Sequence, residues 1–305
     1  MNAPREKFSP AVAELHRLFD LQREAFARER YPSYEARQDR LARLRALLTK
    51  NETRFAAAVD SDFGDRSEHE TRLAELYIVA AEIADAQRQL KHWMRTERVA
   101  TPLHLKPGRA RIERQPLGVA GIISPWNYPV QLALAPALGA LAAGNRALLK
   151  PSEVTPATSA LLRELVAASF DEDEFAVVLG DADVGRAFAR VPFDHLFFTG
   201  STAVGRQVAL AAAEHLTPVT LELGGKSPAF FAPDADLDVA APRLVSGKLL
   251  NAGQTCIAPD YVLVLADCAD ALVAAIRKAA GRLYPAYAAN SDYTAIVNER
   301  HYRRL

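Results

Sequence analysis

The apolar positions repeat in two different ways along this 305-residue chain. Up to about residue 95 they recur at steps of three and four, as in SPAVAELHRLFDLQREAFARE and SEHETRLAELYIVAAEIADAQRQLKHWM. That spacing predicts amphipathic helices, with Ser9-Pro10 and Ser67 at their starts. From residue 117 onward, short apolar runs alternate with longer helical patterns, which predicts strands separated by helices.

The alternating part of the chain predicts a parallel sheet that is covered by helices on both faces. A segment rich in Pro and Arg, 95–110, is expected to be a joint between this part and the first helices. A helix after residue 234 and the run YVLVLA indicate a second α/β unit that begins near Gly225. Strands are expected at 109–115, 117–124, 146–150, 175–180, 195–201 and 218–225, and helices at 129–144, 155–170, 183–190 and 202–215.

Charge and composition narrow the class of protein. Lys+Arg and Asp+Glu number 37 each, so nothing suggests a basic surface for nucleic acid. The most apolar stretch, 117–150, is interrupted by Pro, Asn and Gly, so no membrane span is expected. The only two cysteines, Cys256 and Cys268, lack metal-ligand or CxxC spacing. No metal site is therefore predicted, and so few cysteines favour a reducing compartment, the cytoplasm.

Two segments suggest phosphate and ribose binding. In FTGSTAVG, Gly200 and Ser201 lie between a strand and a helix, where free N–H groups can receive a phosphate. The alternative is an ordinary helix capped by Ser201 or Thr202. In LLKPSE, Lys150 and Glu153 follow a strand, where ligands of open α/β sheets bind, and both can bond ribose hydroxyls. The alternative there is a solvated charge pair in a turn.

Three further residues suggest acyl chemistry. Asn127 in SPWNYP can donate to an oxyanion, or it can simply make a turn before the next proline. Glu222 in TLELGGKSP would have a raised pKa if buried, as suits a general base, or it lies at a solvated strand end. Cys256 in NAGQTCIAPD precedes an expected helix start, which favours a reactive thiol, or it is an inert buried cysteine.

Taken together and in this order, SPWNYP, LKPSE, FTGST, LELGGKSP and GQTC resemble the NAD(P)-dependent aldehyde dehydrogenase superfamily over about residues 10–305. The segments NAGQTCIAPDYVL and DYTAIVNERHYRRL are similar to its class 3 type, particularly the bacterial coniferyl aldehyde dehydrogenases. The resemblance implies an α/β fold in two domains. A helical N-terminus with a parallel-sheet, Rossmann-type cofactor domain would occupy 1–224, and an α/β catalytic domain would begin at 225 and extend to 305.

The resemblance also assigns roles. Cys256 would add to the aldehyde, Asn127 and the backbone N–H of Cys256 would hold the oxyanion, and Glu222 would activate water against the resulting thioester. An aromatic or apolar aldehyde such as coniferaldehyde is the expected substrate. NAD is the expected cofactor, with NADP as the alternative, because Glu153 can repel a ribose 2′-phosphate. The residues expected to bind the cofactor are Trp126, Lys150, Ser152, Glu153, Gly200, Ser201, Gly205 and Leu223.

Three expectations remain open at the level of sequence. The family's later E-x-F-G-P-like motif does not occur before Leu305, so the catalytic domain is expected to be incomplete and the family's homodimer compromised. Trp126, Tyr128 and Tyr261 are expected to line an entry tunnel for substrate, or else to belong to the core. The rival functions are a cofactor-independent cysteine hydrolase that uses Cys256, and a catalytically dead fragment with a binding role.

Overall fold

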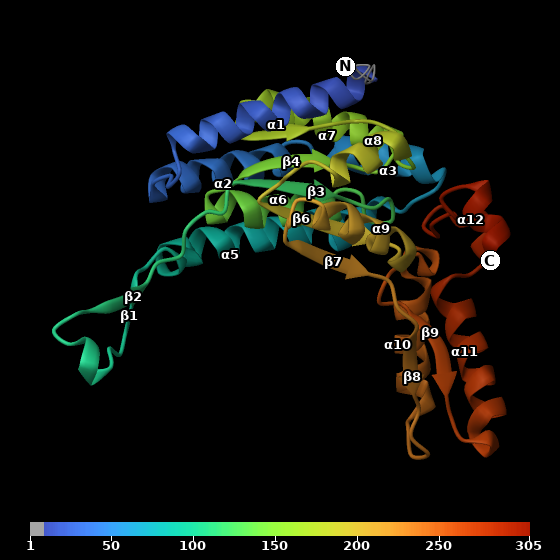
Figure 1. Ribbon diagram of the computed structural model, residues 1–305. Coiled ribbons are helices and arrows are strands. Elements are labelled where there is room, and N and C mark those ends of the chain that lie inside the picture. Colours follow the sequence, from blue (N-terminus) through green and yellow to red (C-terminus); the bar gives the residue numbers. More distant parts are fainter. Residues whose placement is uncertain (1–8) are drawn as a thin grey trace.

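A five-stranded parallel sheet forms the centre of the fold in a computed structural model that describes residues 9–305 (Figure 1). The strand order is β5-β4-β3-β6-β7. The order reverses between β3 and β6, and ligands of open α/β sheets bind at such a switch point, outside the carboxyl ends of the strands. The strands are β3 (Val119–Ile123), β4 (Arg146–Lys150), β5 (Phe175–Val177), β6 (His195–Gly200) and β7 (Val219–Leu223).

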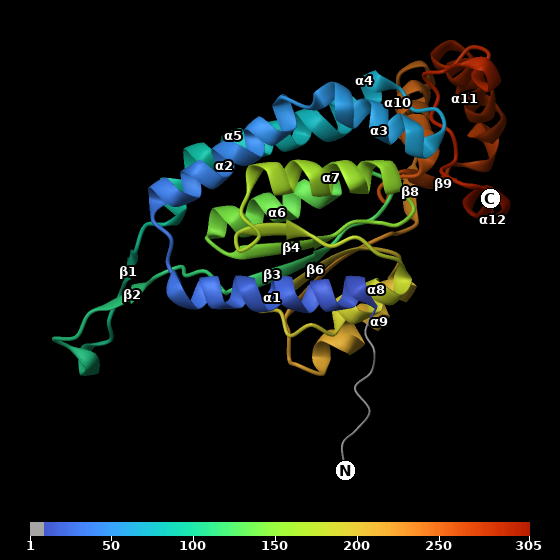
Figure 2. The same cartoon turned by 90° about the horizontal axis from the view of Figure 1, so that it is seen from above.

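Helices cover both faces of this sheet, as the alternating pattern predicts. One face carries α6 (Gln131–Ala143) and α7 (Pro156–Ser169), and the other carries α1 (Pro10–Arg28), α8 (Ala182–Ala189) and α9 (Thr202–Ala213) (Figure 2). An outer layer packs over α6 and α7. It consists of α2 (Tyr34–Thr49), α3 (Glu52–Phe63) and α5 (Ile78–Trp93).

The side chains of the strands explain these two layers. Every residue of β4 is buried, as is usual for a central strand of a parallel sheet. Leu148 packs into the core beneath α1 and α8, whereas its neighbour Leu149 packs into the core beneath α6. Because successive side chains point to opposite faces, one continuous apolar run supplies both cores.

The helix starts predicted at the N-terminus are confirmed. Ser9 caps α1, with its Oγ accepting from the N–H of Val12 at 3.4 Å, and Pro10 is the first helical residue. Ser67 caps the short helix α4 (Glu68–Thr71). The helix expected from there is not uniform, because a π-helical turn, Arg72–Tyr77, separates α4 from α5.

The joint predicted at 95–110 is partly wrong. It contains β1 (Glu97–Val99), which pairs with β2 (Ala110–Ile112) in an antiparallel hairpin around a 3-10 turn, Leu103–Leu105. The hairpin projects away from the sheet (Figure 1), so the strand expected at 109–115 is short and lies outside the parallel sheet. Both short strands are largely exposed, and without a buried face they show no clear alternation of apolar residues.

A smaller unit follows β7 and lies beside the main sheet (Figure 1). Its two strands pair in parallel, and its two long helices pack against each other. The strand predicted from the run YVLVLA is present, although it begins two residues earlier, at Pro259. None of the described helices combines the length and apolarity needed to cross a membrane. The elements are β8 (Ser227–Phe230), α10 (Leu237–Leu249), β9 (Pro259–Leu263), α11 (Ala269–Leu283) and α12 (Glu299–Arg304), with 3-10 turns at Leu250–Gly253, Ala266–Cys268 and Tyr287–Ala289.

Candidate active site

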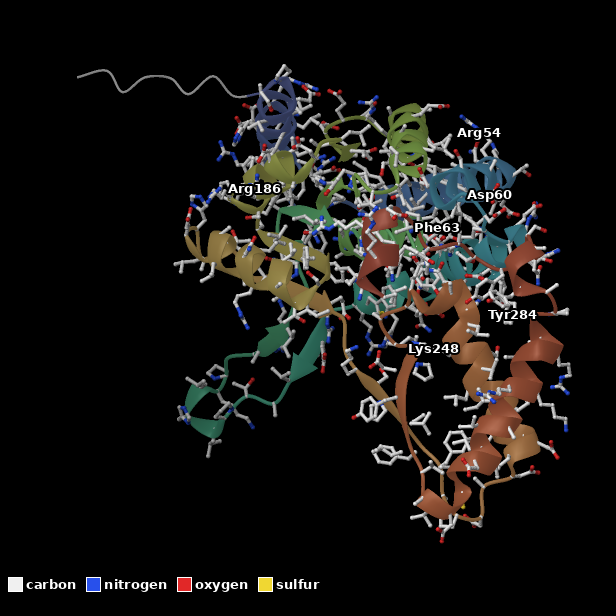
Figure 3. All side chains as sticks on the ribbon, turned by 90° about the vertical axis from the view of Figure 1, so that its right-hand side faces the viewer. Arg54, Asp60, Phe63, Arg186, Lys248 and Tyr284 are labelled. Atoms are coloured by element: carbon white, nitrogen blue, oxygen red, sulfur yellow. The ribbon has the colours of Figure 1, made fainter. Side chains whose placement is uncertain are left out.

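A cavity of about 1460 Å³ opens at the switch point of the sheet. The segment after β3, the ends of β6 and β7, and the loop before β9 all contribute to its wall, so it lies between the sheet and the smaller unit. Figure 3 shows Phe63 in the helical layer and Lys248, which lines the cavity, on α10 of the smaller unit. The predicted site residues in its wall are Trp126, Asn127, Gly200, Ser201, Glu222, Leu223 and Cys256.

The remaining predicted residues, Lys150, Ser152, Glu153 and Gly205, do not line the cavity. Lys150 is buried, and its ammonium group donates to the Glu153 carboxylate at 2.7 Å and to the carbonyl of Pro151 at 3.1 Å. Burial by itself would raise the pKa of Glu153, but the hydrogen bond and charge of Lys150 together with a backbone hydrogen bond outweigh it, so the pKa lies below its usual value. β4 is one strand away from the switch point, which explains the offset.

The start of α9 lies at the wall of the cavity. Ser201 caps this helix, with its Oγ accepting from the N–H of Val204 at 3.3 Å. A Cβ at Gly205 would lie 2.7 Å from Leu223 Cδ2, so the glycine leaves room for the end of the Leu223 side chain between α9 and β7. Thr199 also lines the cavity, and its buried Oγ1 has no hydrogen-bond partner among the described residues. Within residues 9–305, no group of three or more His, Cys, Asp or Glu could hold a metal ion.

Cys256 is an exposed, free thiol in the turn between Leu250–Gly253 and β9. The helix start expected after it is wrong, because the residues from Pro259 onward form a strand that pairs with β8. The alternative reading also placed Cys256 in the interior, and that burial is wrong, since the residue is exposed at the cavity wall.

The turn before Cys256 has an unusual backbone. Asn251 (φ 52, ψ 33), Ala252 (φ 51, ψ 30) and Gly253 (φ 76) are consecutive left-handed residues. For each of the two that carry a side chain, this conformation costs about 1–2 kcal/mol. Asn251 is fully buried, and its Nδ2 donates to the carbonyl of Asn127 at 2.8 Å. Gln254 Nε2 donates back to the Asn251 carbonyl at 3.1 Å, so the turn is held by its own side chains.

The side chain of Asn127 connects the loop after β3 to the turn that precedes Cys256. Its Nδ2 donates to the backbone carbonyl of Gln254 at 2.9 Å. The amide has a second hydrogen, and Asn127 lines the cavity, so one donor remains for a ligand. The adjacent hydroxyls of Tyr128 and Thr255 are 2.7 Å apart, which adds a second bond between the loops. The segments that carry Asn127 and Cys256 therefore form one hydrogen-bonded assembly.

Glu222 is exposed, so of the two readings that the sequence left open, the buried one does not hold. It lies on β7, the edge strand of the described sheet, where it pairs with Thr199 of β6. Leu221 and Leu223 pack on the α9 side, so the alternation of the strand turns Glu222 to the open cavity. The alternative reading, a solvated Glu near a strand end, fits this position.

The three aromatic residues expected in an entry tunnel separate in the structure. Trp126 lines the cavity, where its ring centroid lies 4.6 Å from that of His301 on α12. Tyr128 is buried against Thr255, and Tyr261 is exposed on β9 outside the cavity lining. Of the three, only Trp126 lies in the lining of the cavity.

Sequence reasoning missed a buried ion pair behind the site. The Arg66 guanidinium donates to the Asn127 carbonyl at 2.9 Å and lies 3.1 Å from Glu75, and both charged side chains are fully buried. The other Glu75 oxygen accepts from the N–H groups of Val130 and Gln131 at 2.7 and 3.1 Å. Burial raises the pKa of Glu75, against the opposing effects of Arg66 and these donors. In sequence Glu75 belongs to a helical pattern and Arg66 directly precedes its expected start at Ser67, so neither residue signals that it is buried.

The sequence profile of the aldehyde dehydrogenase family matches residues 11–305, and the chain belongs to this family. The class 3 resemblance is also confirmed. A probable coniferyl aldehyde dehydrogenase from Pseudomonas aeruginosa is 49% identical over 294 residues, which cover 96% of this chain and 62% of the relative. The coniferyl aldehyde dehydrogenase of Pseudomonas sp. strain HR199 is 46% identical over 299 residues, with 97% and 62% covered. This chain thus spans about 62% of the length of both relatives.

Solved structures confirm the fold class. Staphylococcus aureus AldH in a substrate-bound state superposes with a TM-score of 0.92 at 37% identity, over 95% of this chain and 63% of the other. A Mycobacterium tuberculosis aldehyde dehydrogenase complexed with NAD+ gives a TM-score of 0.81 at 29% identity, with 95% and 60% covered. The parallel sheet and the smaller unit therefore belong to the aldehyde dehydrogenase fold.

Proposed function

We propose that this protein carries out the NAD-dependent oxidation of an aldehyde to a carboxylic acid, with Cys256 as nucleophile. One observation carries the proposal: a single cavity is lined by an exposed thiol, an amide donor and a carboxylate, beside the start of a helix. These are Cys256, Asn127 and Glu222, which arrive from three different segments. Membership of the aldehyde dehydrogenase family supports the same chemistry.

The residues around the start of α9 fit a dinucleotide. The first N–H groups of a helix have no intrahelical acceptor, and they attract the negative charge of a pyrophosphate. The unpartnered Thr199 Oγ1 supplies a further hydrogen-bonding atom at the same wall. We assign Gly200, Ser201 and Trp126 to this cofactor region, with Gly205 and Leu223 supporting the helix, and Lys150, Ser152 and Glu153 to its adenine side. NAD-complexed members of the family support NAD, and NADP remains the alternative.

The Cys256 thiolate would add to the aldehyde carbon and form a thiohemiacetal, whose oxygen carries the negative charge. The free N–H of the Asn127 side chain and the backbone N–H of Cys256 would stabilise that oxyanion. One donor of this kind is worth about 3 kcal/mol of the barrier. A nicotinamide cofactor held near Gly200, Ser201 and Trp126 would supply the acceptor for the hydride that leaves the same carbon. A thioester then remains on Cys256, so that one difficult step is divided into easier ones.

Glu222 would complete the reaction by accepting a proton from water as the water attacks the thioester. Its carboxylate faces the cavity and is open to solvent, so water has access to it. Hydrolysis releases the carboxylic acid and returns the Cys256 thiol. A Glu at this position therefore favours water as the acyl acceptor.

For the substrate we propose an aromatic or apolar aldehyde such as coniferaldehyde. The names of the similar Pseudomonas enzymes support this class. The lining supports it too, because Trp126, Ile296 and Leu305 are among the residues that line the cavity. An aromatic ring and aliphatic side chains favour an apolar substrate over a small charged one.

Three further assignments follow. We propose a division of the chain into a cofactor domain, 1–224, and a nucleophile-bearing domain, 225–305, because the parallel sheet ends at β7 and β8 pairs with β9 instead.

Both cysteines are free, which supports a cytoplasmic location. We propose the family's homodimer, weakened in this 305-residue chain, with the projecting hairpin as a contact surface, because Leu103 and Leu105 are 82% and 57% exposed. Light scattering of a variant with both leucines changed to Ser tests this, and an unchanged dimer would exclude a role for the hairpin tip.

The decisive experiment mixes the 305-residue protein with NAD and coniferaldehyde and follows NADH absorbance. Cys256→Ser should abolish turnover, and its matched control, Cys268→Ser, should retain it. Benzaldehyde-type substrates should be oxidised in preference to succinic semialdehyde. Ester or thioester hydrolysis that depends on Cys256 but not on NAD would support the hydrolase instead. If Cys256→Ser turns over aldehyde normally, the covalent mechanism is wrong.

A further inference from the structure

A buried ion pair connects the outer helical layer to both loops of the proposed site. Arg66 lies between α3 and α4, and Glu75 lies on the π-helical turn, a distortion that is frequent at functional sites. Neither charged side chain has exposed surface, and they are 3.1 Å apart. The guanidinium also lies over the rings of Phe63 and Tyr128, at 4.8 and 5.1 Å from their centroids. Packing and charge therefore hold Arg66 in a single orientation.

The point of contact with the site is one backbone oxygen. The carbonyl of Asn127 accepts from Arg66 Nη1 at 2.9 Å and from Asn251 Nδ2 at 2.8 Å. The bond from Arg66 connects this carbonyl to the helical layer, and the bond from Asn251 connects it to the left-handed turn that precedes Cys256. Glu75, the partner of Arg66, also contacts the loop of Asn127, because its carboxylate accepts from the N–H of Val130.

We propose that Arg66, paired with Glu75, is a positioning residue that keeps the Asn127 loop and the turn before Cys256 in their reactive arrangement. The inference rests on the proposed function of Cys256 and Asn127. Left-handed backbone at Asn251 and Ala252 persists only where surrounding contacts impose it. The Asn127 carbonyl is such a contact, and an N–H of the buried Arg66 guanidinium holds that carbonyl in place.

A second acidic residue, Glu70, interacts both with Arg66 and with the turn that precedes Cys256. Burial raises the pKa of Glu70, against the charge of Arg66 and a hydrogen bond from the Thr294 hydroxyl, whose distance to Glu70 is 3.2 Å. The same carboxylate interacts with the backbone of Asn251. Arg66 therefore compensates the charge of two acidic side chains, each of which touches a loop of the site.

The test uses hydrogen exchange read by mass spectrometry, which needs no turnover. Removing one member of a buried pair strands the other charge and destabilises the fold, so the main variant is the double change Arg66→Met with Glu75→Gln. The amide oxygen introduced by Glu75→Gln can still accept from the N–H of Val130, while the bond to the Asn127 carbonyl is lost. The second variant, Arg66→Lys, keeps the charge without the guanidinium. The matched control is Arg54→Met, which removes an exposed arginine of α3 (Figure 3) that pairs with Glu164 of α7.

The expected result is local. The protected N–H of Gln254, which donates to the Asn251 carbonyl at 2.9 Å, should exchange about tenfold faster or more in the double variant, as follows from losing a hydrogen bond to a charged group. Peptides from β6 should be unchanged, Arg66→Lys should be intermediate, and Arg54→Met should match the parent. Unchanged exchange in residues 251–257, or an equal rise throughout the chain, would overturn the inference.

A kinetic measurement separates this inference from the proposed function. In active protein, the double variant should lower kcat about 100-fold, the typical effect of a 1 Å displacement, with the KM for NAD unchanged. Cys256→Ser should abolish turnover without altering exchange at Gln254. A protein without aldehyde turnover but with the expected exchange pattern would refute the proposed function and leave the positioning role intact. A raised KM for NAD with unchanged kcat would refute the role of Arg66.

Discussion

Replacing Gly205 with Ala tests whether close contact between α9 and β7 shapes the cofactor region. An added Cβ would lie 2.7 Å from Leu223 Cδ2 and 3.4 Å from Phe198 Cε1. Carbon atoms prefer about 3.5–4.0 Å, so either α9 or the Leu223 side chain must move by about 1 Å. Leu223 lines the cavity and Ser201 begins the helix, so both kinds of movement disturb the wall of the proposed NAD site.

The magnitude follows from two opposing effects. Ala in place of Gly inside a helix stabilises by about 1 kcal/mol, whereas overpacking costs about 1–3 kcal/mol. Gly281 on α11 is the matched control, because a Cβ there meets nothing within 4 Å. Gly281→Ala should therefore raise the free energy of unfolding by about 1 kcal/mol. Gly205→Ala should be less stable than that control by about 1–3 kcal/mol, the cost of overpacking alone.

Urea unfolding of the two variants measures this difference, and calorimetric titration with NAD measures the consequence. We expect about a tenfold weaker affinity for NAD in Gly205→Ala, equivalent to about 1.4 kcal/mol, and no change in Gly281→Ala. The reasoning is refuted if both variants are equally stabilised and bind NAD equally well. In that case the space beside Leu223 adapts without cost, and the glycine has no role in placing α9.

Three other outcomes follow from the site and its support. Asn127→Ala should lower kcat by about 10²–10³, as expected for an oxyanion donor, and a normal kcat would remove it from that role. Glu222→Gln should release one equivalent of NADH and then stall as an acyl-enzyme on Cys256, visible by mass spectrometry; steady turnover would exclude Glu222 as the base. Burial alone would raise the pKa of Glu174, but Arg43 and Arg40 lower it below its usual 4.5. The charged Glu174 side chain thus stabilises the fold above pH 4.5, and this contribution is lost as the pH falls through the folded pKa. Glu174→Gln should therefore lower the free energy of unfolding by about 1–3 kcal/mol at pH 7 and by progressively less in acid. Urea unfolding at several pH values measures this difference.

The sequence by itself determined the elements of the parallel sheet. Continuous apolar runs such as RALLK and HLFFTG mark buried strands, and the change from a period near four to short runs marks the alternation with helices. These signals are local, because burial on both faces of a strand constrains each of its residues. The motifs around Asn127, Gly200 and Cys256 could also be found from the sequence. Each consists of a few adjacent residues at a strand end or in a turn, so the whole motif appears in one short segment.

Only the tertiary structure decided how these motifs meet. The exposure of Glu222 depends on β7 being an edge strand, and the position of Tyr261 depends on β9 pairing with β8. Arg66 pairs with Glu75, which lies on the π-helical turn. This arrangement depends on packing against the loop of Asn127, 61 residues after Arg66, whose carbonyl accepts a hydrogen bond from Arg66. A charged residue in a helical pattern predicts a solvated face, and only its neighbours in space show that it is buried. The sequence therefore determines which groups are available for chemistry, while packing between distant segments determines their exposure and their partners.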